Sequence, residues 1–247
     1  MIRIGEMLVT PESMGGMQSW EKAKIIKMMS SYNKVYQYNS LDELEFDLEV
    51  KVKITRAAKL LYKSGAEFET FKNSRCNPVY WILHESGAFF LKLEASPQKA
   101  IDDIYFNGRL YAFECATAMV IVYYKAVLDI LGSGKFNELF SDMILYDWEY
   151  NKNLDLHSST STDFLHGDCV YFNNPDFNPQ TPEWRGENCI VLDEDLYFAH
   201  GMGIKSGEEI MAILNYLRKK NPTEPSYLET GRIRLNYKTY YGANRPF

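Results

Sequence analysis

The amino-acid sequence predicts an α+β fold in which helices come first along the chain and strands second. Three observations support this prediction: a capping pattern opens a long segment at 41–63, the run 114–131 is apolar nearly all round, and strand-like segments follow it. The chain has 247 residues, of which 46% are hydrophobic, enough to bury a sizeable core. We expect a single domain over 1–247, with 1–40 and the aperiodic tail 221–247 peripheral.

The first long segment carries signals for both a helix and a strand. Ser40-Leu-Asp-Glu43 is a capping box, in which the Ser side chain accepts from a backbone N–H and the Glu side chain reaches back. Apolar residues from Leu44 to Ile54 then alternate strictly, which is the period of a strand. The length of the segment, its lack of Gly or Pro, and Ala57-Ala58 favour a helix, which we predict.

The next part of the chain predicts a hairpin and a short helix. The segments 79–83 and 88–93 are rich in β-forming residues and flank a turn that contains Ser86-Gly87. Ser96-Pro97 then places Pro at a first helical position, and this helix is expected to stop near Asn107-Gly108.

The second half predicts a buried helix followed by strands. The run 114–131 is apolar on nearly every side and ends before the glycines of 132–134. A second capping box at 206–209 begins a last helix that is expected to reach Lys219-Lys220, and the Ser/Thr-rich segment 157–162 is expected to be a loop. Strands are expected at Met143–Trp148, Asp168–Phe172, Asn188–Leu192 and Leu196–His200.

Composition excludes several functional classes. The 27 basic and 33 acidic residues are interspersed and give a net charge of −6, so no basic face for nucleic acid is expected. The first residues lack a signal-peptide core and no apolar stretch reaches the length of a membrane span, so we expect a cytoplasmic protein without a membrane partner. The cysteines and histidines complete no zinc-ligand spacing, so free thiols and no metal are expected.

Cys115 is the first candidate for chemistry, because it lies at the opening turn of the predicted buried helix. The positive end of the helix dipole favours the thiolate, whereas burial favours the thiol, and a free Cys often only fills space in a core. Glu114 strengthens the candidate, since a carboxylate beside an apolar run rarely enters a core without a reason.

A second cluster of chemical groups lies at 182–189 and is followed by two strands and the segment 199–203. Glu187 would enter one strand and His200 would end its neighbour, so a tight turn at Glu194-Asp195 would bring them close together. The alternatives are a surface loop for Glu187 and a hydrogen bond at a sheet edge for His200.

Five motifs occur in order and closely resemble the small spore-coat transglutaminases of spore-forming bacteria, which are protein-glutamine gamma-glutamyltransferases. The motifs are Tyr111-Ala-Phe-Glu-Cys-Ala-Thr-Ala118, Leu145-Tyr-Asp-Trp148, Gly167-Asp-Cys-Val-Tyr-Phe172, Trp184-Arg-Gly-Glu-Asn188 and Tyr197-Phe-Ala-His-Gly201. The similarity runs from Leu41 to Lys220 and is weak over the first forty residues and the tail.

The resemblance implies a papain-like cysteine-peptidase core, with the nucleophile at the start of a buried helix that packs on an antiparallel sheet. It implies Cys115 as nucleophile, Glu187 as its dyad partner, Glu114 as a substitute carboxylate and His200 in a supporting role. It also implies cross-linking of spore-coat proteins through ε-(γ-glutamyl)lysine bonds, first in the mother-cell cytoplasm and then in the coat. No cofactor and no calcium are implied, and the sequence has no EF-hand-like loop.

Transglutamination requires a thiol that attacks a glutamine carboxamide, a proton for the departing ammonia, and a thioester that survives until a lysine amine arrives. Glu187 could accept the thiol proton and deliver it to ammonia. Ordinary Glu and Cys pKa values differ by roughly four units, so the pair should rest as thiol and carboxylate. Desolvation near Trp184 or Trp148 must therefore raise the pKa of Glu187, and the helix start must lower that of Cys115.

Two other residues compete with Glu187 for the role of base. Successive helical residues point about 100° apart, so Glu114 should not face the thiol. His200 competes because histidine is the usual partner of a catalytic cysteine at neutral pH. We therefore prefer Glu187 and keep His200 as the alternative.

Aromatic residues are expected to exclude water from the thioester. Trp148, Trp184, Tyr171 and Phe68 are candidates to line a narrow channel for the glutamine and lysine stems, with plain core packing as the alternative. Asn188 or backbone N–H groups at the helix start would hold the oxyanion.

The residues alone predict only an enzyme that transfers acyl groups through a cysteine thiol. The resemblance narrows this prediction to a transglutaminase. Two rival functions are a cysteine amidase or peptidase on the same fold and a non-catalytic coat scaffold. Release of glutamate without amide product would favour the first rival, and an unreactive Cys115 the second.

Overall fold

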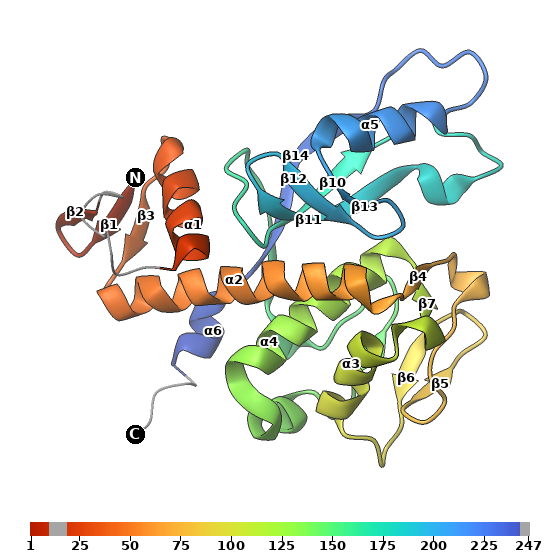
Figure 1. Ribbon diagram of the computed structural model, residues 1–247, viewed down its shortest axis with the longest axis horizontal. Helices are drawn as coiled ribbons and strands as arrows, with labels where there is room; N and C mark the ends of the chain where they lie inside the picture. The colour runs from red at the N-terminus through yellow and green to blue at the C-terminus, as the bar shows by residue number, and fades with distance from the viewer. Residues whose placement is uncertain (10–18, 243–247) are drawn as a thin grey trace.

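A 24-residue helix, α2 (Leu41–Ser64), crosses the middle of the molecule (Figure 1). The structure is a computed structural model that describes residues 1–9 and 19–242. The hydroxyl of Ser40 accepts from the amide of Glu43, and Gly65 ends α2 in the left-handed conformation, with φ at 83°. The prediction of a helix rather than a strand is therefore confirmed.

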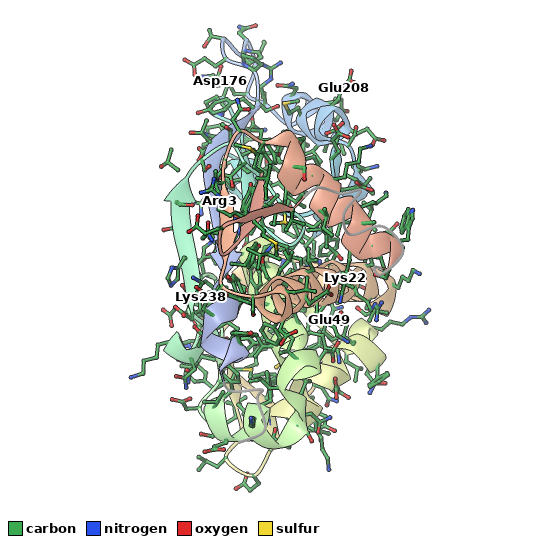
Figure 2. The ribbon with its side chains drawn as sticks, turned by 90° about the vertical axis from the view of Figure 1, so that its left-hand side faces the viewer. Arg3, Lys22, Glu49, Asp176, Glu208 and Lys238 are labelled. Carbon is green, nitrogen blue, oxygen red and sulfur yellow. The ribbon has the colours of Figure 1, made fainter. Side chains whose placement is uncertain are left out.

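Three short strands near the N-terminus form a small sheet that lies at one end of α2 (Figure 1). Its central strand pairs antiparallel with one neighbour and parallel with the other. The helix α1 lies between β2 and β3 in sequence, and Lys22 of α1 lies beside Glu49 of α2 (Figure 2), with an ion pair of 3.3 Å. The elements are β1 (Ile2–Ile4), β2 (Met7–Val9), α1 (Trp20–Ser31) and β3 (Tyr36–Tyr38).

Short strands and the helix α3 form the opposite end of the molecule. The predicted hairpin is confirmed, and β8 adds a third strand to it, although β8 is much shorter than the predicted strand at 143–148. The predicted short helix is also confirmed, with Pro97 in its first turn. The elements are β4 (Glu67–Phe68), β5 (Trp81–Leu83), β6 (Phe89–Leu91), α3 (Pro97–Phe106), β7 (Ala112–Phe113) and β8 (Ile144–Leu145).

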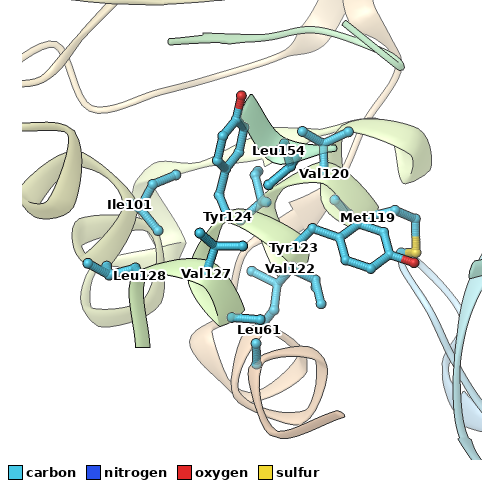
Figure 3. Packing of buried hydrophobic residues seen from close by; sticks show 14 of the residues in the cluster. Leu61, Ile101, Met119, Val120, Val122, Tyr123, Tyr124, Val127, Leu128 and Leu154 are labelled. Atoms are coloured by element: carbon cyan, nitrogen blue, oxygen red, sulfur yellow. The ribbon is translucent and has the colours of Figure 1, made fainter. Parts of the chain in front are cut away.

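The buried helix α4 (Cys115–Leu139) forms the centre of the largest core cluster. Figure 3 shows Tyr123 and Val127 of α4 among its neighbours, with Leu61 of α2 and Ile101 of α3 close by. The helix extends beyond its predicted end, across a kink at Gly132. By length and composition α4 would suffice to cross a membrane, but 72% of its most apolar window is buried inside the protein, as in a core helix.

The main sheet has six strands in the order β13-β12-β11-β10-β14-β9, all paired antiparallel. The strands predicted near 168–172, 188–192 and 196–200 are confirmed as β10, β11 and β12. The elements are β9 (Leu156–Thr160), β10 (Cys169–Asn173), β11 (Gly186–Asp193), β12 (Leu196–Ala199), β13 (Gly203–Lys205) and β14 (Tyr227–Leu235).

Two segments differ from the prediction. The segment 157–162, expected to be a loop, contributes to β9, an edge strand whose exposed Ser and Thr side chains give no apolar alternation. The tail, expected to be peripheral, supplies β14 between β10 and β9. The apolar pattern of β14 is interrupted by Arg232, which is buried and forms an ion pair with Asp163.

Helices cover the two faces of the main sheet. The start of α4 contacts β11 on one face, and α5 (Gly207–Tyr216) packs on the other through Ile210 and Leu214. The predicted capping box of α5 is confirmed, but the helix ends at Tyr216 rather than near Lys219. A short helix, α6 (Tyr237–Tyr241), follows β14 and packs on α2.

Buried polar groups join the N-terminal sheet to the main sheet. Asp163 accepts hydrogen bonds from Ser161 and from Tyr36 of β3, and it pairs with Arg232 of β14. Burial alone would raise the pKa of Asp163, but these partners hold it well below its usual value. This charged cluster therefore fixes the position of β14 as well as that of the N-terminal sheet.

Candidate active site

Glu114 caps the helix that begins with Cys115. Its backbone is extended, with φ at −77° and ψ at 161°, and its Oε2 accepts from the amide of Ala116 at 2.8 Å. Its Oε1 accepts from the thiol of Cys115 at 3.2 Å. The expectation that Glu114 faces away from the thiol is therefore wrong, because a capping residue lies outside the helix and does not follow the 100° rotation.

Glu187 lies near the start of β11 and is fully buried. Neither of its carboxylate oxygens has a hydrogen-bond partner of good geometry within the described residues, and the backbone amide of His200 interacts with the group only weakly. Burial raises the pKa of Glu187 well above its usual value, and the negative charge of Glu114 raises it further. The backbone amide of His200 acts in the opposite direction but does not outweigh burial. The carboxyl group therefore favours its neutral form, as a buried and unsatisfied carboxylate should.

The thiol of Cys115 is also buried, and Asn188 is its second polar neighbour. Burial raises the pKa of this thiol well above its usual value, and the charges of Glu187 and Glu114 raise it further. The side-chain nitrogen of Asn188 lies 3.4 Å from the sulfur and, with the Asn188 amide, favours the thiolate. The net direction is opposite to the lowering expected from the helix start, because burial outweighs it.

His200 directly follows β12 but makes no hydrogen bond to Cys115 in the described part of the chain. Its Nε2 lies 3.1 Å from the carbonyl oxygen of Glu67, and its ring stacks on Phe113 with centroids 4.8 Å apart. Burial lowers the pKa of His200 to about 4, so the ring is neutral at pH 7. The geometry therefore fits a supporting residue that is fixed by the backbone.

A cavity of about 530 Å³ opens onto Cys115. Of the aromatic residues predicted to line a channel, Trp148 and Tyr171 line this cavity, together with Asn188. Phe68 and Trp184 instead pack on each other, with ring centroids 5.2 Å apart, and line a separate hollow of about 520 Å³ beside His200. The single predicted channel is therefore divided between two hollows.

Several residues that line the cavity were not predicted. The Asp147 backbone has a positive φ of 49°, and its amide donates to the hydroxyl of Thr117 on α4 at 3.0 Å, which fixes the turn before Trp148. Asp147 lies inside a motif that pointed to the family, so its sequence signal was available. The further lining residues are Thr70, Phe71, Ala116, Pro182, Glu183, Arg185 and Gly186.

Gly186 makes room for the ring of Tyr171. A Cβ atom at this position would lie 2.1 Å from the hydroxyl oxygen of Tyr171 and 2.6 Å from the carbonyl oxygen of Phe172. Only a residue without a side chain allows Tyr171 to lie across the start of β11. Gly186 therefore allows Tyr171 to form one wall of the cavity, next in sequence to Glu187.

This arrangement is suited to acyl transfer. It combines a thiol, a carboxylate that accepts its hydrogen bond, a carboxyl group held in its neutral form, and a side-chain amide that donates toward the sulfur. Such a set can form a covalent acyl-enzyme, protonate a leaving group and stabilise an oxyanion.

Comparisons with known proteins agree with this chemistry. The family model "Protein-glutamine gamma-glutamyltransferase" matches residues 1–244. A protein of that name from Bacillus subtilis is 44% identical over 242 residues, covering 98% of each chain. Another from Halalkalibacterium halodurans is 42% identical over 204 residues, covering 83% of this chain and 72% of the relative.

A solved structure matches as well. It is described as a transglutaminase from Geobacillus stearothermophilus without its C-terminal extension, with a TM-score of 0.80 and 41% sequence identity. The match covers 84% of this chain and 100% of the other. The similarity expected over 41–220 thus extends over nearly the whole chain, and the mixed helix-and-sheet fold is confirmed.

Proposed function

This chain belongs to the protein-glutamine gamma-glutamyltransferase family, and we propose that Cys115 performs its acyl transfer through a thioester. The activity of the family is that of a transglutaminase, an acyltransferase that acts on glutamine residues of proteins. The observation that carries the proposal is the Cys115 thiol, which lies at the start of a buried helix, borders the cavity and is hydrogen-bonded to Glu114 and Asn188.

In the first half-reaction the sulfur of Cys115 attacks the side-chain carbonyl carbon of glutamine. The thiol proton passes to a carboxylate, the carbon–nitrogen bond breaks, and ammonia leaves with the proton it requires. Glu114 is suited to accept the thiol proton because its Oε1 already accepts the thiol hydrogen bond. Glu187 is suited to protonate ammonia, because burial favours its neutral acid form. We keep Glu187 as the dyad partner and Glu114 as the second carboxylate.

In the second half-reaction a lysine amine attacks the thioester carbonyl. The carbon–sulfur bond breaks, an ε-(γ-glutamyl)lysine bond forms, and the thiol regains a proton. Asn188 is suited to stabilise the oxyanion of both steps, because its amide nitrogen lies 3.4 Å from the sulfur. Trp148 and Tyr171 line the cavity and would limit the access of water to the thioester.

The core is proposed to be papain-like. In support, α4 begins with Cys115, its start contacts β11, and β11 carries Glu187 in an antiparallel sheet. His200, which directly follows the adjacent strand β12, is proposed to support Glu187 through its backbone amide, since its ring is held by the carbonyl oxygen of Glu67 and by Phe113.

The proposed substrates are proteins of the spore coat, which supply the glutamine and lysine side chains. The enzyme would be made in the mother-cell cytoplasm and then act in the coat, without calcium, nucleic acid or a membrane. The support is the resemblance of the five motifs to spore-coat transglutaminases.

The decisive experiment supplies a glutamine donor protein and a fluorescent primary amine to the wild-type enzyme and to Cys115→Ala. We expect the wild type to form a stable amide and an acyl-enzyme detectable by mass spectrometry, and the variant to form neither. Amine incorporation by Cys115→Ala at the wild-type rate would refute the proposal. Cys76→Ala is the matched control, because Cys76 is a free cysteine that does not line the cavity.

A further inference from the structure

A third hollow, of about 370 Å³, lies on the main sheet next to the cavity of Cys115. Residues of β9, β10, β11 and β14 line it, and it shares Tyr171 and Asn188 with the first cavity. The hollow beside His200, which Phe68 and Trp184 line, shares no lining residue with the first cavity. We call this third hollow the β14 groove.

The β14 groove carries one uncompensated charge. Its two charged lining residues are Glu229 and Arg232. Arg232 is buried and forms an ion pair with the carboxylate of Asp163. It also donates a hydrogen bond to the backbone carbonyl oxygen of Asp163. Glu229 is half-buried, accepts a hydrogen bond from the side chain of Asn173 at 3.0 Å, and forms no ion pair within the described residues. The groove therefore offers a negative charge to a cation.

The field of Glu229 reaches the wall between the groove and the thiol. Tyr171 belongs to that wall, and its pKa is raised to about 12, mainly by burial and by the charge of Cys115; Arg185 on the side of the Cys115 cavity lowers it, and Glu229 on the side of the groove raises it further. Asn188, the second shared residue, contacts the sulfur of Cys115. A group that enters the β14 groove is thus next to the reacting atoms.

The chemistry of the second half-reaction requires such a route. While the acyl group occupies the cavity of Cys115, the amine must approach the thioester from another side. A lysine side chain is a cation at neutral pH, with a pKa of about 10.4, whereas a glutamine side chain is neutral. A carboxylate in a groove attracts the acceptor and not the donor.

We propose that the β14 groove receives the lysine-bearing acceptor segment and that Glu229 is the specificity-determining residue that attracts its cation. The ammonium group gives one proton to a carboxylate or to water before the neutral amine attacks the thioester. The amide bond forms, the carbon–sulfur bond breaks, and the second amine proton returns to the sulfur. This inference rests on the thioester mechanism proposed above.

The test measures the KM for a lysine-containing acceptor peptide at saturating glutamine donor, for the wild type and for Glu229→Gln. We expect Glu229→Gln to raise the acceptor KM about three- to fivefold at low salt, the effect of losing one partly exposed ion pair. The increase should shrink in about 1 M salt, where charges are screened within about 3 Å. Glu229→Lys should raise the acceptor KM about tenfold or more, because it reverses the charge.

Two controls separate recognition of charge from a change of structure. Hydroxylamine, which is largely uncharged at neutral pH, should show the same acceptor KM with Glu229→Gln as with the wild type. Glu67→Gln removes a carboxylate from the hollow beside His200 but keeps the backbone carbonyl that contacts the His200 ring, so it should leave the KM for the lysine peptide unchanged. Thermal unfolding of each variant checks its folding.

The inference is overturned if Glu229→Gln leaves the acceptor KM for the lysine peptide at its wild-type value. It is also overturned if Glu67→Gln, or Glu183→Gln in the cavity of Cys115, raises that KM in its place. Failure of the wild type to form an acyl-enzyme refutes the thioester mechanism instead. An acyl-enzyme that transfers to lysine with unaltered KM in Glu229→Gln refutes the role of Glu229 alone.

Discussion

The thiol of Cys115 donates its hydrogen bond to Glu114, the residue directly before it, at 3.2 Å. The other oxygen of the same carboxylate caps the helix that Cys115 begins. Glu114 thus accepts a hydrogen bond from one of the unpaired N–H groups at the start of α4 and a second one from the thiol. Glu187, the carboxyl group that the motifs favoured, has no hydrogen-bond partner of good geometry within the described residues. The two carboxyl groups therefore differ in environment, and their roles should separate in kinetics.

The Glu187→Gln variant should lose about 10²- to 10⁴-fold in kcat, because it removes the group suited to protonate ammonia. Glu114→Gln should lose less, about tenfold, because the single carbonyl oxygen of Gln can still accept one of the two hydrogen bonds, either from the helix start or from the thiol. Rates of ammonia release with a glutamine donor compare the two variants. A larger loss in Glu114→Gln than in Glu187→Gln would exchange their roles, and abolition by His200→Ala alone would assign the base to His200.

Glu187→Gln should also stabilise the protein as the pH rises. Because the folded pKa of Glu187 lies well above its usual 4.5, the folded state binds the proton more tightly than the unfolded state. The stability contributed by this group is complete below pH 4.5 and is lost as the pH rises through the folded pKa. The Tm of the variant should exceed that of the wild type increasingly as the pH rises above 4.5.

The comparison of the two Tm values removes the effect of other titrating groups. His200, whose pKa is lowered to about 4, destabilises the fold only as the pH falls below its ordinary value of 6.5. It acts equally in both proteins. A Tm difference that stays constant, or falls, with rising pH would contradict the raised pKa of Glu187.

Gly186→Ala should impair activity by displacing Tyr171. The added methyl group would meet the Tyr171 hydroxyl at 2.1 Å and the carbonyl oxygen of Phe172 at 2.6 Å. We expect a loss of about tenfold or more in kcat/KM for amine incorporation, since misplacement by about 1 Å near reacting groups is costly. Tyr171→Ala in the same chain should restore only part of the activity, because the contact with the Phe172 backbone remains.

Gly134→Ala is the matched control for this substitution. A Cβ atom at Gly134 meets nothing within 4 Å, and the residue lies on the exposed side of α4. The activity of this variant should equal that of the wild type, and its stability should rise by up to about 1 kcal/mol. Equal activity of Gly186→Ala and the wild type would show that Tyr171 is not held by this contact.

Amine incorporation should persist after exhaustive dialysis against a calcium chelator. The half-reactions assigned above use only side chains of the protein, namely Cys115, Glu114, Glu187 and Asn188. Assays with and without added calcium measure this directly, with Cys115→Ala as the blank. A requirement for added calcium would contradict the resemblance to the calcium-independent spore-coat enzymes.

The sequence predicted the helices better than the sheet. Ser40 and Gly65 bound α2 by capping chemistry that does not depend on the rest of the fold. The alternation inside α2 was misleading because α1, α4 and the main sheet cover several of its sides. By contrast, β14 contains a buried arginine whose partner, Asp163, lies on a distant segment. A pattern search along the chain cannot find a strand that is stabilised by such a long-range ion pair.

The motifs pointed to Cys115 and Asn188, which the structure brings together, but not to the contacts between the candidate residues. Cys115 and Asn188 lie within hydrogen-bond distance, although 72 residues separate them, and only the motifs linked the two segments. The contact between Glu114 and the thiol was missed because the sequence could not show that the helix begins after Glu114. The separation of Phe68 and Trp184 from the Cys115 cavity depends on how their rings pack, which periodicity does not determine.

The position of β14 has a consequence for how the sheet assembles during synthesis. It is the last strand of the main sheet to be synthesised, yet it lies between β10 and β9. On the ribosome, a nascent chain that already contains Cys115 and Glu187 therefore has a split sheet and lacks the groove that Glu229 completes. Pairings between segments so far apart also form slowly. The sheet that carries Glu187 is therefore complete only once β14 has been synthesised, well after Cys115 and Glu187 themselves.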